Sequence, residues 1–416
     1  MAIFLFAVSV LFVVWVARRK KIPALSPYGI FAAFQILYNV LPWFVSSLGI
    51  NNPIYSLLSD SHVINIQLQL AAISNLCFGL IHLCFSRNVR LGDPTLPSSK
   101  SNRTNYLLLT FPLFILTCVL CEKYGWHQYT FANYDTGGEG LGGMFTVTAY
   151  AKFSFVAVYL YYLYRFGLDK GAWILLLEHV IVMVIDGARA TFLPILLLTL
   201  FILLGKIDAN KTKRIYVLAI LGITASIGTR ALILKSGDWL QDMIIPVTVE
   251  GTMGDYATLQ SIYAVEHLFR PPYSAGASYV IDPLAWLIPQ SMGRKRFTFA
   301  DRWGNEIDPI LRERFNPMGG FYFLSESITA FSYLGPAIVT TTFAGFLVWF
   351  ERNKNRHRML YLAWMPTLGI QFIKTPFGNC FKLFAVQIIC LAAFRFLAEI
   401  KTQLPNRASQ KLALQS

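Results

Sequence analysis

The apolar residues of this chain are grouped in runs of about twenty, separated by polar connectors. An α-helix of this length crosses the hydrocarbon core of a bilayer. The pattern therefore predicts an all-α polytopic membrane protein with about eleven transmembrane helices. The predicted spans are 2–17, 27–50, 63–86, 105–121, 145–165, 172–186, 190–205, 215–233, 323–350, 358–373 and 379–397.

Basic residues fall at every second connector between the predicted spans. The first span is followed by Arg18-Arg19-Lys20-Lys21, the reverse of a signal peptide, so we expect it to stay attached with its N-terminus outside. The C-terminus is then predicted to be cytoplasmic. The other inner connectors carry Arg87, Arg90, Lys100 and Arg103; Arg165 and Lys170; Lys206, Lys211, Lys213 and Arg214; and Arg352, Lys354, Arg356 and Arg358.

One long polar interval, 234–322, interrupts the succession of spans. It is predicted to be a large extracytoplasmic loop that contains short helices. The chain is therefore predicted to consist of an N-terminal bundle of about eight helices (1–233), this loop, and about three C-terminal helices with a cytoplasmic tail (323–416). We expect function in the loop and in the span ends that face it.

The composition supports a membrane protein, with 55% hydrophobic and 14% charged residues. The net charge of +14 does not indicate nucleic-acid binding, because the basic residues lie in small clusters between apolar spans. The six cysteines lie in or beside spans and imply no disulfide framework. The glycine-rich stretch 135–143 lacks the Lys-Ser/Thr of a P-loop and is interpreted as a flexible connector.

Several ionisable residues fall in predicted spans, where each costs about 2.5–3.5 kcal/mol to insert and is usually paired, hydrated or functional. Glu178 and His179 point about 100° apart on a helix, so they do not serve one site directly. We interpret them as a buried pair that satisfies neighbouring polar groups. The full set is Lys152, Glu178, His179, Arg189, Arg230, Glu326, Lys374 and Lys382.

Two of these arginines lie at the predicted outer surface. Arg189 follows Asp186 in the sequence Asp-Gly-Ala-Arg between two short apolar runs, and Arg230 lies near Lys235 at the outer end of the next hairpin. Positive charge is disfavoured outside unless it meets an anion there, although a snorkelling side chain is the alternative. A guanidinium forks onto phosphate oxygens, so these residues indicate a site for an anionic lipid headgroup.

Within the long loop, 254–269 is predicted to form an amphipathic helix. Tyr256, Gln260, Tyr263 and His267 share one face at three- and four-residue spacing. Aromatic rings with polar tips suit stacking on sugars, and packing at the bilayer interface is equally compatible. His267 is a candidate general base, although a single helical histidine is more often only hydrogen-bonded.

Further along, an apolar segment bounded by prolines, 281–293, leads directly into three cations, Arg294, Lys295 and Arg296. This order predicts a surface-lying or re-entrant piece that delivers charge to the headgroups. Arg312 and Arg314 follow. Glu326 then lies one helical turn into the next span, where low dielectric and nearby hydroxyl groups favour a role as a proton acceptor.

At this point the chain resembles the Wzy-type family of O-antigen and oligosaccharide repeat-unit polymerases. The resemblance covers about residues 185–390 in pattern: Gly187-Ala-Arg189 at an outer hairpin, a large late periplasmic loop, and a Pro-flanked segment ending in basic residues. A motif then opens the next helix, with Gly319, Gly320, Phe321, Glu326, Tyr333 and Gly335. The chain departs from the family at Phe331-Ser332, where members often have Asn-Phe, and at Lys374, where Arg is commoner.

The resemblance implies a multi-pass glycosyltransferase of the bacterial inner membrane with a periplasmic N-terminus. It would join oligosaccharide units linked to undecaprenyl diphosphate, as donor and acceptor, on the periplasmic side. Cations would take up the charge of the diphosphate leaving group, and one base would activate the acceptor hydroxyl. No cofactor or metal is expected, and a polysaccharide chain-length regulator is an expected partner beside the membrane lipids.

The residue roles follow this implied reaction. Glu326 leads as catalytic base and His267 follows, while Tyr256 and Tyr263 are the candidate sugar-binding residues. An O-antigen ligase and a lipid-linked oligosaccharide flippase are the alternative functions. Charges gathered at the outer face, and the lack of repeated halves, favour an enzyme over a transporter. The diphosphate-binding candidates are Arg189, Arg230, Arg294, Lys295, Arg296, Arg312 and Arg314.

Overall fold

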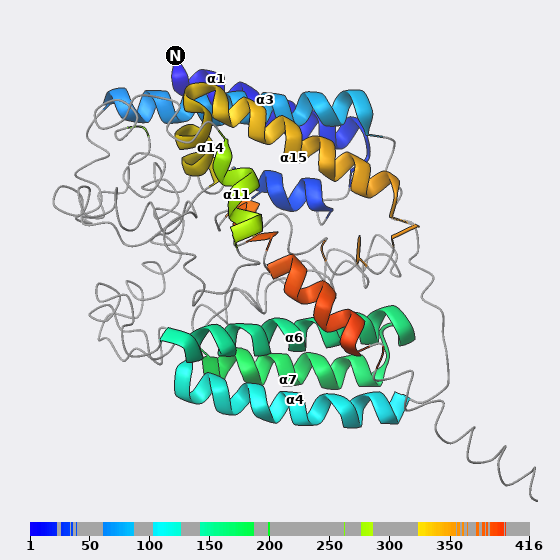
Figure 1. Cartoon of the computed structure of the whole chain (residues 1–416). Helices are drawn as coiled ribbons and strands as arrows, with labels where there is room; N and C mark the ends of the chain where they lie inside the picture. Colours follow the sequence, from blue (N-terminus) through cyan, green and yellow to red (C-terminus); the bar gives the residue numbers. More distant parts are fainter. Residues whose placement is uncertain are drawn as a thin grey trace, which may run out of the picture. The chain divides into compact units, whose positions relative to one another are not determined.

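A computed structural model of the chain contains only helices among the residues it describes (Figure 1). The described helices belong to two compact units, α1, α3, α11, α14 and α15 in one and α4, α6 and α7 in the other. The predicted three-part division into bundle, loop and C-terminal helices stays a prediction. The described residues are 1–22, 26–33, 35, 39, 61–86, 103–125, 142–186, 199, 262, 276–285, 323–354, 356–357, 360–361, 364, 372–373, 377–378, 380–381, 383–394 and 396.

Three long helices of the first unit, α1 (Ala2–Arg19), α3 (Ser61–Phe85) and α15 (Gly335–Arg352), run in the same direction. Between α1 and α3, the Asn75 amide donates to Ser9 Oγ at 3.1 Å and Lys20 Nζ donates to the Ser86 carbonyl at 3.0 Å, with the same sequence separation of 66 residues in both contacts. A constant separation defines a parallel pair. Their carboxyl-terminal ends therefore lie together.

The same relation holds between α3 and α15. Ser74 Oγ and Thr340 Oγ1 lie 2.7 Å apart near the middle of the pair, and Arg352 donates to the Phe85 carbonyl at its end. Gln35 joins the contact between Ser74 and Thr340, because its side-chain amide donates to Ser74 Oγ at 2.7 Å. Hydrogen bonds between buried polar side chains join helices whose outer faces are apolar.

An aromatic cluster fills the space between these helices and the segments that follow. The ring of Phe31 is fully buried and lies 4.4 Å from Phe78 and 5.1 Å from Phe343, measured between centroids. Phe343 stacks in parallel on Phe372 at 3.7 Å. Rings of this size bury large apolar areas, so the cluster supplies much of the packing of the unit.

The segment predicted as the span 323–350 is long and apolar enough to cross a membrane, but it contains a break. The chain forms α14 (Phe323–Phe331), a 3-10 turn (η5, Ser332–Leu334) and then α15. Ser332 has a φ of 55°, which does not continue a right-handed helix. A methyl group at Gly335 would overlap the Ser327 carbonyl oxygen, so the chain folds back closely on α14. An apolar run shows the length of a span but not a break of this kind.

The second unit contains α4 (Arg103–Tyr124), α6 (Gly142–Phe166) and α7 (Lys170–Asp186). The end of α6 contacts the start of α7, where Tyr162 bonds to Asp169, and the first half of α6 contacts the end of α7, where Lys152 bonds to Asp186. The two helices are therefore antiparallel, as predicted for consecutive spans. A shorter apolar helix, Leu383–Phe394, belongs to the same unit, and Cys390 Sγ lies 2.9 Å from Ser154 Oγ.

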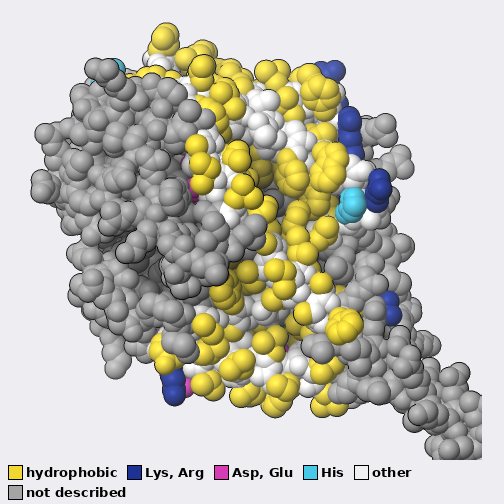
Figure 2. All heavy atoms as spheres, viewed as in Figure 1, with side chains coloured by type: hydrophobic (Ala, Val, Ile, Leu, Met, Phe, Trp, Pro, Cys, Tyr) yellow, Lys and Arg dark blue, Asp and Glu magenta, His cyan; other side chains and the backbone are white. Residues whose placement is uncertain are grey.

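Four helical segments among the described residues are long and apolar enough to cross a membrane: Ala2–Arg19, Asn65–Phe85, Tyr106–Tyr124 and Phe323–Arg352. The last of these contains the break. Hydrophobic side chains make up most of the described surface on the face shown in Figure 2, and Lys and Arg side chains lie at its edges. Exposed apolar side chains of this kind suit contact with lipid. The predicted spans 190–205 and 215–233 lie outside the described residues, apart from residue 199.

Candidate functional site

Glu326 lies in the first turn of α14 and is 1% exposed. Its Oε2 atom accepts a hydrogen bond of 2.8 Å from the backbone N–H of Phe377, a residue far along the chain. Its Oε1 atom has no hydrogen-bond partner among the residues that the structure describes. A buried carboxyl group with one oxygen held and the other unpartnered is suited to receive a hydroxyl group.

The neighbouring hydroxyl groups of α14 are mostly engaged within the helix. Ser327 Oγ donates to the Leu324 carbonyl at 2.8 Å, and Thr329 Oγ1 donates to the Glu326 carbonyl at 2.9 Å. These bonds to the preceding turn are a common arrangement for Ser and Thr in helices. The hydroxyl groups of Ser327 and Thr329 are therefore bonded within α14, and the predicted role of Glu326 as a proton acceptor stays a prediction.

The polar groups that do face Glu326 come from α11 (Ala277–Ala285). The Ser278 hydroxyl lies beside the Glu326 carboxyl, although it does not meet the geometry of a hydrogen bond, and the carboxyl of Asp282 acts electrostatically on the same group. Ser278 and Asp282 are four residues apart, which places them on one face of the helix. They are 6% and 1% exposed.

Backbone and ring contacts hold α11 against the end of α14. The N–H of Gly276 donates to the Ala330 carbonyl at 3.2 Å, which satisfies one of the carbonyl groups that the helix end leaves open. Gly276 has a φ of +76°, and a side chain there would overlap the ring of Phe331. Only glycine combines this backbone conformation with this close approach.

Tyr279 completes the junction. Its ring stacks on Phe331 with centroids 6.0 Å apart and lies 5.2 Å from the ring of Phe377, whose backbone N–H binds Glu326. Burial raises the pKa of the Tyr279 phenol well above its ordinary value, and the nearby Glu326 carboxyl adds to this effect. The phenol is therefore neutral at physiological pH. No ion pair of Glu326 occurs among the described residues.

A separate polar feature lies in the second unit, where Lys152 Nζ and Asp186 Oδ2 form an ion pair of 2.7 Å. Both side chains are almost fully buried. Asp186 is the last residue of α7, directly before the Gly187-Ala-Arg189 sequence. Lys152 is one of the ionisable residues in the predicted spans, and the ion pair with Asp186 neutralises its buried charge.

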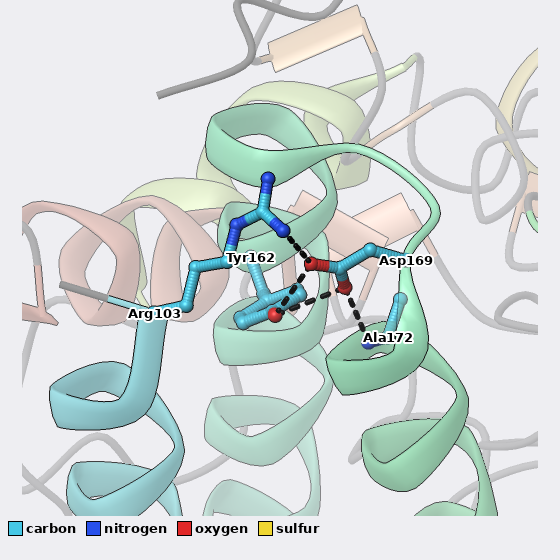
Figure 3. A network of polar contacts seen from close by, with 4 residues as sticks. All are labelled: Arg103, Tyr162, Asp169 and Ala172. Atoms are coloured by element: carbon cyan, nitrogen blue, oxygen red, sulfur yellow. Dashed lines mark hydrogen bonds and ion pairs between the residues drawn. The ribbon is translucent and has the colours of Figure 1, made fainter. Parts of the chain in front are cut away.

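The opposite end of the same unit carries a second network (Figure 3). The Asp169 carboxylate accepts hydrogen bonds from Tyr162 Oη at 3.0 Å and from the backbone N–H of Ala172 at 3.0 Å, and it pairs with Arg103 at 3.1 Å. Asp169 thus caps α7 and ties it to α4 and α6. The role of this network is structural, because each group in it has a protein partner.

His179 is buried and stacks on Phe155 with centroids 3.9 Å apart, while its Nδ1 atom lies 2.7 Å from the Leu175 carbonyl. Glu178 is half-buried. Its Oε2 atom has no partner among the described residues. His179 Nε2 likewise has no hydrogen-bond partner among the described residues. The interpretation of the two residues as a buried pair that satisfies neighbouring polar groups therefore stays a prediction.

Among the predicted site residues, only Glu326 lies in the described part of the chain. Ser278 and Asp282 are not among the predicted site residues, although both are polar and lie four residues apart in an apolar stretch. The residues outside the described ranges are His267, Tyr256, Tyr263, Arg189, Arg230, Arg294, Lys295, Arg296, Arg312 and Arg314.

The described residues contain no group of three or more His, Cys, Asp or Glu side chains placed to hold a metal ion. Metal independence of the reaction stays a prediction. The chain matches no protein-family model, and it has no significant match to a curated protein or to a solved structure. The site therefore has to be interpreted from its own geometry and from the sequence motif that contains it.

Proposed function

We propose that the protein is a glycosyltransferase of the bacterial inner membrane that joins undecaprenyl-diphosphate-linked oligosaccharide units on the periplasmic side, in O-antigen or capsule synthesis. The observation that carries the proposal is the state of Glu326. It is a buried carboxyl group with no ion pair in the described part of the chain, and one oxygen is free to accept a proton. It lies inside the motif on which the resemblance to repeat-unit polymerases rests.

In the proposed reaction, Glu326 takes the proton of an acceptor hydroxyl group. The oxygen of that hydroxyl forms a bond to the anomeric carbon of the donor sugar, and the bond from that carbon to the diphosphate oxygen breaks. The electron pair of the broken bond leaves with undecaprenyl diphosphate. A general base of this kind contributes a rate factor of about 10²–10⁴.

The leaving diphosphate needs positive charge at the membrane surface. The described surroundings of Glu326 supply none, so the proposal assigns this task to the predicted cationic residues, Arg189, Arg230, Arg294, Lys295, Arg296, Arg312 and Arg314. The separation of roles is chemically reasonable, since a carboxylate paired to an arginine would be a poor base.

Two alternatives use related substrates. An O-antigen ligase would take the same donor and transfer it to a lipid A-core acceptor, and the Glu326 site suits that reaction equally well. A flippase would need polar groups along a path through the membrane. The buried Lys152–Asp186 pair is one such group, but both of its charges are satisfied by each other.

The test is deletion of the gene, followed by gel separation of the surface polysaccharide and a chemical inventory of the lipid-linked intermediates. We expect the ladder to collapse to core plus one unit. Long lipid-linked chains that are not attached to core would instead indicate a ligase, and single units trapped facing the cytoplasm would indicate a flippase.

Complementation of the deletion strain then tests the base. Glu326→Gln keeps the size of the side chain and removes the proton acceptor, so we expect polymerisation to fall about 100-fold or more at an unchanged membrane level of the protein. Ser327→Ala is the matched control, because the Ser327 hydroxyl is bonded to its own helix. Full polymerisation by the Gln variant would remove Glu326 from the mechanism.

A further inference from the structure

The carboxyl-terminal ends of α1, α3 and α15 form one cationic surface, which we call the basic end. Lys20 Nζ donates to the Ser86 carbonyl at 3.0 Å, and Arg352 donates to the Phe85 carbonyl. The two carbonyl groups are consecutive at the end of α3, so the two cations lie within roughly 10 Å of each other. In Figure 2, Lys and Arg side chains and a histidine lie along the right-hand edge, where α15 ends in Figure 1. The cations of the basic end are Arg18, Arg19, Lys20, Lys21, Arg352, Lys354 and Arg356.

The charge of the basic end is almost entirely positive. Against its seven cations, the described residues of the three helix ends contain one acidic residue, Glu351. Carbonyl groups at a helix end carry partial negative charge, and those of α3 are bound by Lys20 and Arg352. The other cations include four exposed side chains that form no ion pair with a described residue: Arg18, Arg19, Lys21 and Arg356. Their charge is available to an anion.

Exposed aromatic side chains lie directly beside these cations. Trp15 is 44% exposed, and the guanidinium of Arg19 lies over its ring at 5.0 Å from the centroid. On α15, Trp349 is 51% exposed and lies 6.2 Å from the ring of His357, measured between centroids. Tryptophan beside basic residues is typical of the level at which hydrocarbon gives way to headgroups. A soluble anion would contact only the cations, whereas a lipid contacts both kinds of side chain.

We propose that the basic end is a binding site for an anionic phospholipid, in the leaflet that the predicted topology makes cytoplasmic. Its phosphate lies among the cations, and its acyl chains lie along the exposed apolar side chains of α1 and α15. The positive-inside pattern predicts cations at every inner connector but no particular site. Here helix packing brings cations from distant parts of the sequence to one helix end, where several of them bind one phosphate. The inference does not depend on the proposed glycosyl transfer.

Lipid binding is measured on the purified full-length protein in a neutral detergent, by native mass spectrometry and by the unfolding temperature. The probes are dioleoyl phosphatidylglycerol, dioleoyl phosphatidylcholine, and glycerophosphoglycerol, which is the anionic headgroup without acyl chains. We expect phosphatidylglycerol to remain bound and to raise the unfolding temperature, and the other two probes to do neither. Its binding should weaken as the ionic strength rises from about 0.05 to about 0.5 M.

Paired variants assign this binding to the basic end. Lys21→Gln combined with Arg356→Gln removes one exposed cation from each contributing segment and leaves Lys20 and Arg352 in place. The dissociation constant for phosphatidylglycerol should rise about 30-fold, because each cation near an anionic lipid surface contributes about five-fold. The matched control, Arg165→Gln combined with Lys170→Gln, removes two exposed cations of the second unit on the same predicted side of the membrane. It should change the constant by less than about two-fold.

Three results would overturn the proposal. Equal binding of phosphatidylglycerol and phosphatidylcholine would show that the charge of the headgroup is not recognised. Equal losses in the two double variants would show a general effect of net charge and no site. Binding of glycerophosphoglycerol as tight as that of the whole lipid would assign the surface to a soluble anion.

A green fluorescent protein fused after Ser86 checks that the double variant keeps its orientation in the membrane. If its fluorescence is lost, the single variant Lys21→Gln is measured instead, with an expected loss of affinity of about five-fold. An unchanged dissociation constant in that variant would count against the basic end in the same way.

Discussion

At the scale of single residues, three acidic groups in the described part of the chain fall into two kinds. Lys152 and Asp186 neutralise each other across 2.7 Å, and Asp169 is satisfied by three donors. Glu326 has one hydrogen bond and no described counter-charge. The first kind explains how helices with ionisable residues fold, and the second marks the place where reactivity is expected.

Removal of one partner of the Lys152–Asp186 pair should be far worse than removal of both. Lys152→Met alone leaves a buried carboxylate without a counter-charge, and we expect it to lower the free energy of unfolding by about 3–5 kcal/mol. The double variant Lys152→Met with Asp186→Leu should recover most of this loss. Denaturant unfolding of the purified protein in detergent measures both.

A lysine at the surface provides the control for this pair. Lys170 is exposed at the start of α7, so Lys170→Met should change the free energy of unfolding by less than about 0.5 kcal/mol. Equal losses in the Lys152 single variant and in the double variant would show that the methylene groups of Lys152, and not its charge, stabilise the unit.

At the scale of the elements, the junction of α14, η5 and α15 decides where Glu326 lies. The chain reverses closely enough that the Cα atom of Gly335 packs against the carbonyl of Ser327. α11 then docks on the end of α14 through Gly276 and Tyr279. A continuous helix through 323–350 would have left Ala330 no free carbonyl for Gly276.

Gly335→Ala tests this junction. The added methyl group would overlap backbone atoms of Ser327, which have no freedom to move aside, so we expect little folded protein in the membrane fraction. Gly345→Ala is the matched control in the same helix, because nothing lies within 4 Å of its added methyl group. It should fold normally and gain up to about 1 kcal/mol in stability. Equal yields of the two variants would argue against the close approach.

The sequence predicts this region only in part. The apolar run predicts the helix α15, and a single carboxyl group in an apolar segment indicates Glu326 as a site residue. Both features are visible in the local sequence. The break at Ser332 depends on the close packing of Gly335 on Ser327, and the hydrogen bond from Phe377 to Glu326 spans 51 residues of chain. Contacts of this range leave no periodic trace in a single sequence.

At the scale of the whole molecule, helix direction tests the predicted topology. α3 and α15 run parallel, which requires an odd number of crossings between them if both span the membrane. The five spans predicted between 86 and 323 satisfy this condition. The total of about eleven spans and the outward orientation of the long loop stay predictions.

Reporter fusions measure on which side of the membrane each helix end lies. We expect a green fluorescent protein to be fluorescent when fused after Ser86, Gly167 or Asn353, because basic residues mark those ends as cytoplasmic. Alkaline phosphatase fused after Gly125 should be active, because α4 and α6 are antiparallel, with Tyr106 against Phe166 and Phe114 against Phe155. Opposite signals at Ser86 and Asn353 would contradict the parallel arrangement of α3 and α15.

The hydrogen bond from Phe377 to Glu326 spans 51 residues of chain, and this separation has a consequence for biosynthesis. At translation rates of about 5–20 residues per second, the ribosome needs roughly 3–10 s to reach Phe377 after Glu326 has been made. During that interval α11 and α14 exist without the group that holds the carboxyl. If Glu326 acts as the proposed base, a nascent chain is therefore inactive until the segment that contains Phe377 has been made.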